Sequence, residues 1–430
     1  MAGVGMEQVR EEKAMSASYR VVIVGGGVGG MELVVGLGKQ RAAHPPLEVT
    51  LIDRSSVHYW KPMLHEFAAG TVSHEQDCID FSVEAARHNF RFVQASLSGV
   101  DRAAKSIAVT TAGGAHQSIP YDALVVALGS RANDFGIAGV LEHCAFIDSL
   151  SDASAFRARF RDEFIAADRE QRPLAIGIVG GGATGTQLAA ELCHAIDETP
   201  SLGPAARART LRMTLIETGP RILPAFPERV STEARAQLEK LGVDVRCEAM
   251  VIGVDETGFA LKDGTHIDAP LKVWAAGVRA TDATNLFEDL DRGRGGQITV
   301  DAHLRTPKDP SIFAIGDCAR NNEEPLPATA QVARQQGIYL AQNMERFAAG
   351  GPVDPFVYRD RGSVVAFANY NGWGMMPNAK SFGGGPLRGI GARLVHDILY
   401  RQHQGTVSGH ARGVTAFLQG LFGKRDQHPL

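Results

Sequence analysis

Two stretches of the chain consist of consecutive apolar residues without polar alternation, Val21–Val24 and Leu174–Val179. A strand that is buried on both faces has this pattern, whereas a half-exposed strand alternates. Each stretch leads directly into a glycine-rich turn and then into a segment typical of a helix, Met31–Val35 after the first turn and Thr186–Ile196 after the second. This repeated order of strand, turn and helix predicts an α/β fold built from two similar units.

The first unit has the spacing Gly25-x-Gly27-x-x-Gly30 and continues into a second predicted strand, Val49–Ile52, that ends on Asp53. In a dinucleotide-binding turn, the first glycine makes the tight turn, the second lets the backbone approach a pyrophosphate, and the third lets helix and strand pack closely. The helix N-terminus offers N–H groups to the phosphates, and the acid accepts hydrogen bonds from ribose hydroxyls. We therefore predict a dinucleotide site; the alternative is a tight turn without a ligand.

The second unit repeats the pattern with Gly180, Gly182 and Gly185, followed by the predicted strand Met213–Ile216 and the acid Glu217. Two such units imply two dinucleotides, or a duplicated fold in which one site is inactive. Because both units retain the terminal acid, we favour two working sites.

Three further apolar segments extend the two predicted sheets, and each carries a glycine at or near its end. They are Tyr121–Gly129, Leu271–Gly277 and Ile312–Ala319, the last of which contains the pair Gly316–Asp317.

The remaining predicted elements are less regular. Ser56–Gly70 mixes aromatic, basic and histidine side chains, which is too irregular for a surface helix. We predict a loop packed over a ligand, with a hydrophobic lid as the alternative. Pro327 is predicted to start a helix over Ala328–Phe347, since proline suits a first helical turn. Phe356–Tyr358 and Gly362–Phe367 are predicted to be short strands.

The composition narrows the classes of protein. At 430 residues the chain is long enough for two or three domains, and its 44% hydrophobic and 21% charged residues are typical of globular proteins. The net charge of −4 argues against nucleic-acid binding. The five cysteines are odd in number and include no CxxC pair, so we expect no disulfide framework. Residues 1–19 are predicted to be a disordered leader, and no apolar run is long enough to span a membrane.

With these motifs in place, the chain resembles the type II NADH:quinone oxidoreductases, also called alternative NADH dehydrogenases. These are flavoproteins with two dinucleotide-binding domains and a glutathione-reductase-like fold. The resemblance extends from Arg20 to about Gly420. It depends on six segments, His58–Glu66, Val179–Gly185, Arg221–Pro224, Val273–Gly277, Ile315–Ala319 and Ala330–Gln335.

The resemblance implies two Rossmann-like domains and a C-terminal α/β region for membrane attachment. The FAD-binding domain would comprise residues 20–145 and 297–350, the NADH-binding domain residues 146–296, and the C-terminal region residues 351–430. The FAD ligands would include Gly25, Gly27, Gly30, Asp53, Lys61, Pro62, Gly316 and Asp317. The NADH ligands would be Gly180, Gly182, Gly185 and Glu217, and Gly129 and Gly277 are further candidate cofactor-binding glycines.

The resemblance also implies a reaction. Hydride would pass from NADH to FAD, and two electrons and two protons would then pass to a membrane quinone. Glu217 would favour NADH over NADPH, because a carboxylate binds a free 2′-hydroxyl and repels a 2′-phosphate.

Four side chains are candidates for catalysis. Gln331 and Gln335 are four residues apart on one helix face, and in the family the matching glutamines line the quinone pocket. The alternative is a pair of exposed helix polars. Gln187 departs from the family, which usually has glutamate there, so proton delivery at this position is in doubt. Glu191 lies one turn further along the helix and is the candidate substitute.

The C-terminal region suggests an attachment surface. Leu394–Leu399 and Val414–Phe422 each contain an apolar stripe with basic flanks, typical of amphipathic helices at an anionic membrane. We expect peripheral attachment to the cytoplasmic face of the cell membrane; the alternative is docking on the protein itself or on the second subunit of a homodimer.

Two other functions remain open. One is a sulfide:quinone oxidoreductase using Cys144 and Cys318, and the other is a flavin-binding redox sensor with little turnover.

Overall fold

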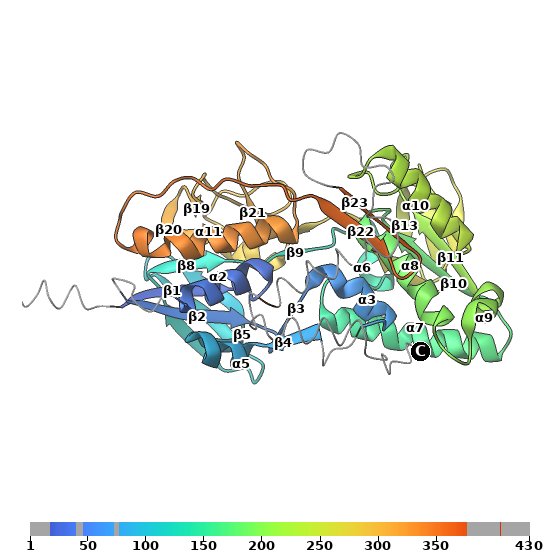
Figure 1. The fold of residues 1–430 in the computed structure, drawn as a ribbon, viewed down its shortest axis with the longest axis horizontal. Coiled ribbons are helices and arrows are strands. Elements are labelled where there is room, and N and C mark those ends of the chain that lie inside the picture. Colours follow the sequence, from blue (N-terminus) through green and yellow to red (C-terminus); the bar gives the residue numbers. More distant parts are fainter. Residues whose placement is uncertain (1–17, 40–45, 73–76, 376–404, 406–430) are drawn as a thin grey trace, which may run out of the picture.

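The computed structural model describes residues 18–39, 46–72, 77–375 and 405. Over these residues the chain forms two α/β lobes that lie side by side along the long axis (Figure 1). One lobe contains an eight-stranded sheet and the other a four-stranded parallel sheet. The prediction of an α/β fold with two similar units is confirmed.

The larger sheet has β1 at its centre, in the order β19-β20-β8-β1-β2-β5-β6-β7. Strand β1 runs parallel to β2 and β8, so its aliphatic side chains are almost completely buried. The strands are β1 (Tyr19–Val24), β2 (Leu47–Asp53), β5 (Arg91–Asp101), β6 (Ser106–Thr111), β7 (His116–Pro120), β8 (Ala123–Val126), β19 (Arg305–Thr306) and β20 (Asp309–Ala314).

Two chain segments far apart in sequence build this lobe. Strand β20 pairs in parallel with β8, and the pair Gly316–Asp317 follows β20. This pairing brings Gly316 and Asp317 beside the first glycine turn. Helix α2 (Val28–Gly38) packs along α11 (Ala330–Ala348), and α5 (Phe81–His88) lies nearer the opposite end of the sheet (Figure 1).

The smaller sheet has the order β12-β11-β10-β16, with every strand parallel to its neighbour. Its strands are β10 (Leu174–Val179), β11 (Leu211–Ile216), β12 (Val243–Arg246) and β16 (Leu271–Trp274). The helices of this lobe are α7 (Leu150–Arg169), α8 (Ala183–Asp197), α9 (Gly203–Thr210) and α10 (Glu228–Lys240).

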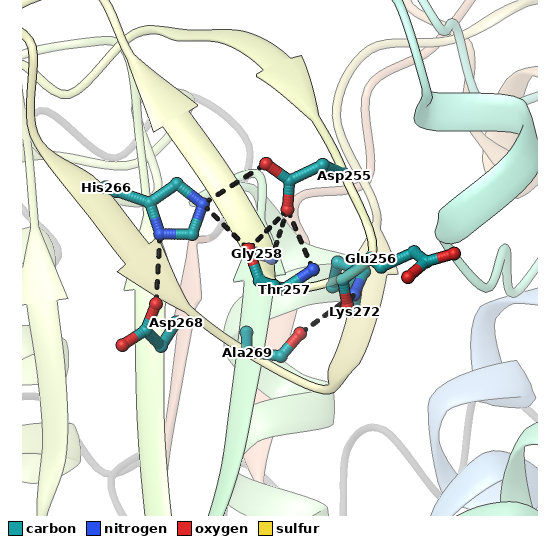
Figure 2. A network of polar contacts seen from close by, with 8 residues as sticks. All are labelled: Asp255, Glu256, Thr257, Gly258, His266, Asp268, Ala269 and Lys272. Atoms are coloured by element: carbon teal, nitrogen blue, oxygen red, sulfur yellow. Dashed lines mark hydrogen bonds and ion pairs between the residues drawn. The ribbon is translucent and has the colours of Figure 1, made fainter.

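A small antiparallel sheet lies against the second lobe, formed by β13 (Val251–Val254), β14 (Gly258–Leu261) and β15 (His266–Asp268). Figure 2 shows the polar contacts that hold it to β16. The buried ammonium of Lys272 donates to the carbonyls of Glu256 at 2.8 Å and Ala269 at 3.0 Å, and burial lowers the pKa of Lys272. These bonds hold the turn between β13 and β14 and the connection from β15 to β16, which lie at the same end of the small sheet.

Two pairs of short strands lie near the seam between the lobes. Strand β9 (Ser130–Arg131) pairs antiparallel with β17 (Arg279–Ala280), and β18 (Ile298–Thr299) pairs with β21 (Ala319–Arg320). The other short elements are β3 (Val57–Tyr59), η1 (Lys61–Met63), α3 (Leu64–Ala69), β4 (Cys78–Asp80), α6 (Val140–His143), η2 (Asp282–Phe287) and η3 (Gly316–Cys318).

Three expectations about local structure are corrected. The segment Ser56–Gly70 is not an irregular loop, because it forms β3, a 3₁₀ turn and the helix α3. Helix α3 packs against α7 and α8 and is buried on most sides, so it lacks the polar face that would reveal a surface helix.

The other two corrections concern the chain near α11. Helix α11 begins at Ala330 rather than near Pro327, because the Thr329 hydroxyl caps it by accepting from the Val332 N–H at 3.3 Å. Phe356–Tyr358 pairs with no other strand of the described chain. The predicted strand at Gly362–Phe367 does form, as β22 (Ser363–Phe367), and pairs with β23 (Asn371–Met375).

The hairpin β22–β23 docks on the second lobe. The Tyr370 hydroxyl donates to Asp197 at 2.6 Å, and the Trp373 indole N–H donates to Glu233 at 2.9 Å. The predicted amphipathic helices at Leu394–Leu399 and Val414–Phe422 lie outside the described residues, as does the predicted leader up to residue 17.

Candidate dinucleotide sites

The first glycine turn shows which glycines the protein itself requires. Gly25 has φ +109°, and a Cβ there would lie 2.3 Å from the Ala127 carbonyl oxygen. A Cβ at Gly30 would lie 2.0 Å from the Gly25 oxygen, so the close packing of helix on strand needs glycine. A Cβ at Gly27, in contrast, would meet no protein atom within 4 Å. The space above Gly27 is therefore open to a ligand, which fits the passage of a pyrophosphate.

The second turn has the same geometry. Gly180 has φ +115°, and its Cβ would lie 2.7 Å from the Ala275 oxygen. A Cβ at Gly185 would lie 2.0 Å from the Gly180 oxygen, whereas Gly182 again has no neighbour within 4 Å. Both turns thus leave the middle glycine facing open space.

Two acids, one at the end of β2 and one directly after β11, each brace their own glycine turn. Asp53 accepts from the Gly26 N–H at 2.6 Å and the Ser55 N–H at 2.8 Å. Glu217 accepts from the N–H groups of Gly181 and Gly219, both at 2.6 Å. This bracing role was not foreseen from the sequence. Burial raises the pKa of the Asp53 carboxyl, against the opposing effect of the Gly26 hydrogen bond.

The helices that follow the turns begin with unoccupied backbone donors. Gly27 precedes α2 and Gly182 precedes α8, and neither offers a capping side chain. Neither helix has an acidic residue in its first turn. No side chain from the N-cap or the first turn of either helix therefore competes with a phosphate for the first helical N–H groups.

The carboxyl edges of the two sheets converge on the seam. Strand β8 ends at Val126 and leads into β9, while β16 ends at Trp274 and leads into β17. Because β9 and β17 pair directly, with Ala280 opposite Ser130, the two edges meet. In open α/β sheets ligands bind at the carboxyl edge, so two bound dinucleotides would have their reactive ends near this seam.

A short chain of polar contacts lies on the larger lobe's side of the seam. The Lys61 ammonium donates to the Ser130 carbonyl at 2.5 Å and lies 3.4 Å from its hydroxyl. The Ser130 hydroxyl donates to Asp317 at 2.6 Å. The structure thus joins Lys61 and Asp317, which the resemblance assigned to one cofactor. Ser130 was not predicted as a site residue. Its only signal in the sequence is its position directly after Gly129, which has φ +67° in the structure.

The turn before Asp317 is held from α11. The Gly316 N–H donates to the buried Gln336 side chain at 2.6 Å, and Gly316 has φ +70°. Gln336 was not predicted, since nothing in a helical Gln-Gln pair distinguishes the one that faces a distant turn. Pro62 lies in the 3₁₀ turn η1 and is exposed.

The two glutamines assigned to a quinone pocket bind backbone in this structure. Gln331 donates to the Gly362 carbonyl at 2.9 Å and accepts from the Arg361 N–H at 2.6 Å. Gln335 donates to the Arg359 carbonyl at 2.8 Å and accepts from its N–H at 3.0 Å. They share a helix face, as expected, and that face holds the segment 359–362.

Gln187 and Glu191 both lie in the buried part of α8. Their exposed fractions are 6% and 5%. Glu191 accepts from the Thr71 hydroxyl at 2.8 Å, which ties α8 to the end of α3. Glu191 is thus a buried carboxylate in the helix that follows the second glycine turn.

The cysteines are poorly placed for thiolate chemistry. Burial raises the pKa of the Cys318 thiol to about 11 and that of Cys144 to about 12. No group of His, Cys, Asp and Glu side chains in the described residues is arranged to hold a metal ion. Among the helices described, none has the length and apolar character needed to cross a membrane.

Comparison with known proteins gives one consistent result. The model of the pyridine nucleotide-disulphide oxidoreductase family matches residues 19–337. A type II NADH:quinone oxidoreductase of Haemophilus influenzae is 36% identical over 419 residues, covering 90% of this chain and 94% of the relative. One of Staphylococcus saprophyticus is 32% identical over 369 residues, covering 83% and 89%.

Solved structures share the fold. NDH2 from Plasmodium falciparum in complex with NADH has a TM-score of 0.82 at 20% identity, covering 95% of this chain and 99% of that one. The sulfide:quinone oxidoreductase of Aquifex aeolicus has a TM-score of 0.72 at 18% identity, covering 95% and 96%.

Proposed function

We propose a function on the premise that the chain belongs to the pyridine nucleotide-disulphide oxidoreductase family and, within it, to the type II NADH:quinone oxidoreductases. The protein oxidises NADH and reduces a membrane quinone through bound FAD. The observation that carries the proposal is the convergence of two equivalent, acid-braced glycine turns on one seam. An enzyme that passes a hydride between two dinucleotides needs both reactive ends at one place. FAD, when bound, accepts the hydride and releases electrons to the quinone.

The FAD site would lie in the larger lobe. Gly27 and the start of α2 would receive the pyrophosphate, and Asp53 would accept from the adenosine ribose while bracing the turn. Lys61, Ser130 and Asp317 would present one continuous polar surface to the remaining part of the cofactor. Gly25, Gly30, Gly129 and Gly316 would shape the backbone around it.

The NADH site would lie in the smaller lobe. Gly182 and the start of α8 would receive the pyrophosphate, with Gly180, Gly185 and Gly277 shaping the backbone. Glu217 would bind the 2′-hydroxyl, so that a 2′-phosphate is repelled. This division of labour assigns the FAD-binding domain to residues 20–145 and 297–350, and the NADH-binding domain to residues 146–296.

The reduction of quinone needs protons as well as electrons. Glu191 would hold a proton near the reaction centre, because Gln187 cannot ionise. While Gln331 and Gln335 hold the segment 359–362, that segment would line the quinone side in their place. The two glutamines would line it themselves after releasing the segment.

A steady-state assay tests the proposed activity. Purified protein reconstituted with FAD should oxidise NADH only slowly on its own and much faster with a short-chain quinone, in a ratio of one NADH to one quinone. Rapid sulfide oxidation, or NADH oxidation that no quinone accelerates, would contradict the proposal. The raised pKa of both candidate cysteines argues against the sulfide reaction.

The proposal includes attachment to the membrane. Residues 351–430 would bring the quinone site to the cytoplasmic face of the membrane, through the apolar stripes after residue 390 or through a homodimer that presents them together. A chain ending at Gly409 should appear in the soluble fraction and keep NADH oxidation by a soluble dye. Continued sedimentation with membranes would contradict attachment by the last segment.

A further inference from the structure

Phe135 has a backbone conformation that is rare for a bulky residue. It lies in the connection between β9 and α6, with φ +52°, in the left-handed region. Its side chain is nevertheless not buried, since the residue is 59% exposed. Strain of this kind persists only when the surrounding structure imposes it, and it gathers at ligand sites.

The connection around Phe135 is fixed against the end of β16. Asn133 accepts from the Phe135 N–H through its side chain at 3.0 Å. The Asn133 carbonyl accepts from the Trp274 indole N–H at 2.7 Å. The backbone N–H of Asn133 donates to the Ala276 carbonyl at 3.3 Å. The conformation of Phe135 is therefore set by contacts with the residues that follow β16.

The ring lies over Gly277. A Cβ at Gly277 would come within 2.5 Å of the ring atom Cζ and 3.0 Å of Cε2, so any other residue here would displace the ring from its present position. Gly277 itself has φ +63°. The tip of the aromatic ring thus lies against Gly277, and more than half of the residue is exposed.

The sheet order places this ring along the path of a dinucleotide. The smaller sheet runs β11-β10-β16, with Glu217 after β11, the glycine turn after β10 and Gly277 after β16. If the adenosine ribose lies at Glu217 and the pyrophosphate at Gly182, the other half of the molecule passes over the end of β16. Gly180 is already in contact with this end, since its Cβ would lie 2.7 Å from the Ala275 oxygen.

We propose that Phe135 is a substrate-binding residue that packs against the nicotinamide half of the dinucleotide. The inference rests on the proposed function, because it requires the smaller lobe to be the NADH site. A flat, partly apolar heterocycle gains from stacking on an aromatic ring, and the oxidised nicotinamide adds a positive charge that the ring face attracts. The left-handed backbone conformation of Phe135 sets the direction of its ring. A conformation with negative φ would direct the ring elsewhere.

The test separates the nicotinamide from the rest of the ligand. Binding of NAD⁺ and of ADP-ribose, which lacks the nicotinamide, would be measured by calorimetry on the FAD-loaded enzyme and on Phe135→Ala. Alanine keeps a Cβ and hence the same backbone demand. We expect NAD⁺ to bind roughly tenfold more weakly and ADP-ribose to bind as in the wild type, with KM for NADH rising and Phe135→Tyr retaining wild-type affinity.

A matched control is Leu141→Ala, because Leu141 is an apolar residue on α6, directly after this connection, that is 63% exposed. This variant should change neither affinity. Equal weakening of NAD⁺ and ADP-ribose in Phe135→Ala, or no weakening of either, would overturn the inference. Wild-type protein that binds NAD⁺ but does not oxidise NADH would refute the proposed activity alone, and wild-type protein that binds neither ligand would refute both.

Discussion

At the scale of single residues, Asp53 at the end of β2 and Glu217 after β11 each accept a backbone N–H of their own glycine turn. In the proposed function the same carboxylates would also face the ribose of a bound dinucleotide. Removing the charge should therefore affect both the turn and the choice of ligand.

Glu217→Gln tests the choice of ligand. The amide has one acceptor oxygen in place of two and no negative charge, so repulsion of the 2′-phosphate is lost. We expect the ratio of kcat/KM for NADH to that for NADPH to fall by about tenfold or more. The matched variant Asp53→Asn should leave this ratio unchanged and weaken FAD retention. A constant ratio in Glu217→Gln would show that the acid only braces the turn.

Gln187→Glu restores a titratable group at the position where the family usually has one. Because the site is 6% exposed, burial should raise the pKa of the new carboxyl above its ordinary value. Its neutral, protonated form then dominates below that pKa and can deliver a proton, so kcat should gain at low pH and lose the gain as pH rises through it. Identical pH profiles for the variant and the wild type would place Gln187 outside the reaction centre.

Local pattern identified the residues that act near their own turn. The glycines and the acids belong to one strand–turn–helix unit, so their spacing alone predicts them. Ser130, Gln336 and Phe135 escaped prediction because their roles depend on partners far along the chain. Nothing in the local sequence of a serine or a glutamine reveals such a partner.

At the scale of elements, the FAD lobe depends on the contact between α2 and α11. Gly337 lies against Gly29, since a Cβ at Gly337 would be 2.3 Å from the Gly29 carbonyl oxygen. Beside this contact the guanidinium of Arg334 donates to the buried Glu32 at 2.8 Å. The two helices are about 290 residues apart in the chain, since α2 ends at Gly38 and α11 starts at Ala330.

Gly337→Ala tests the importance of this close approach. The added methyl group must push the helices apart, which should cost about 1–3 kcal/mol of stability and displace the start of α2 from the pyrophosphate. We expect a lower Tm and faster loss of FAD on dilution. Gly113→Ala is the control, because a Cβ there meets no atom within 4 Å. Equal Tm values for the two variants would contradict the tight packing.

Elements with a strong apolar pattern were predicted well. Strand β10 occupies the predicted residues Leu174–Val179, because a strand buried on both faces needs an unbroken apolar run. Helix α3 was missed for a related reason: it is covered by α7 and α8, so it shows no helical alternation of polar and apolar positions. The extended segment at Phe356–Tyr358 was mistaken for a strand because its aromatics pack on other parts of the lobe, with Phe356 against Tyr339.

At the scale of the whole molecule, the short pair β9–β17 brings the carboxyl edges of the two sheets together. Two dinucleotides bound at these edges would meet at the seam, where Lys61, Ser130 and Asp317 form a polar chain. The sequence predicted two sites but gave no information on their relative placement, since the pairing of β9 with β17 joins residues that share no local motif.

An anaerobic titration of the FAD-loaded protein with NADH, followed through the flavin absorbance, tests the central claim most directly. The account predicts that about one equivalent of NADH bleaches the flavin and that added quinone restores the oxidised spectrum. Protein that retains no flavin, or flavin that NADH leaves oxidised, would contradict it.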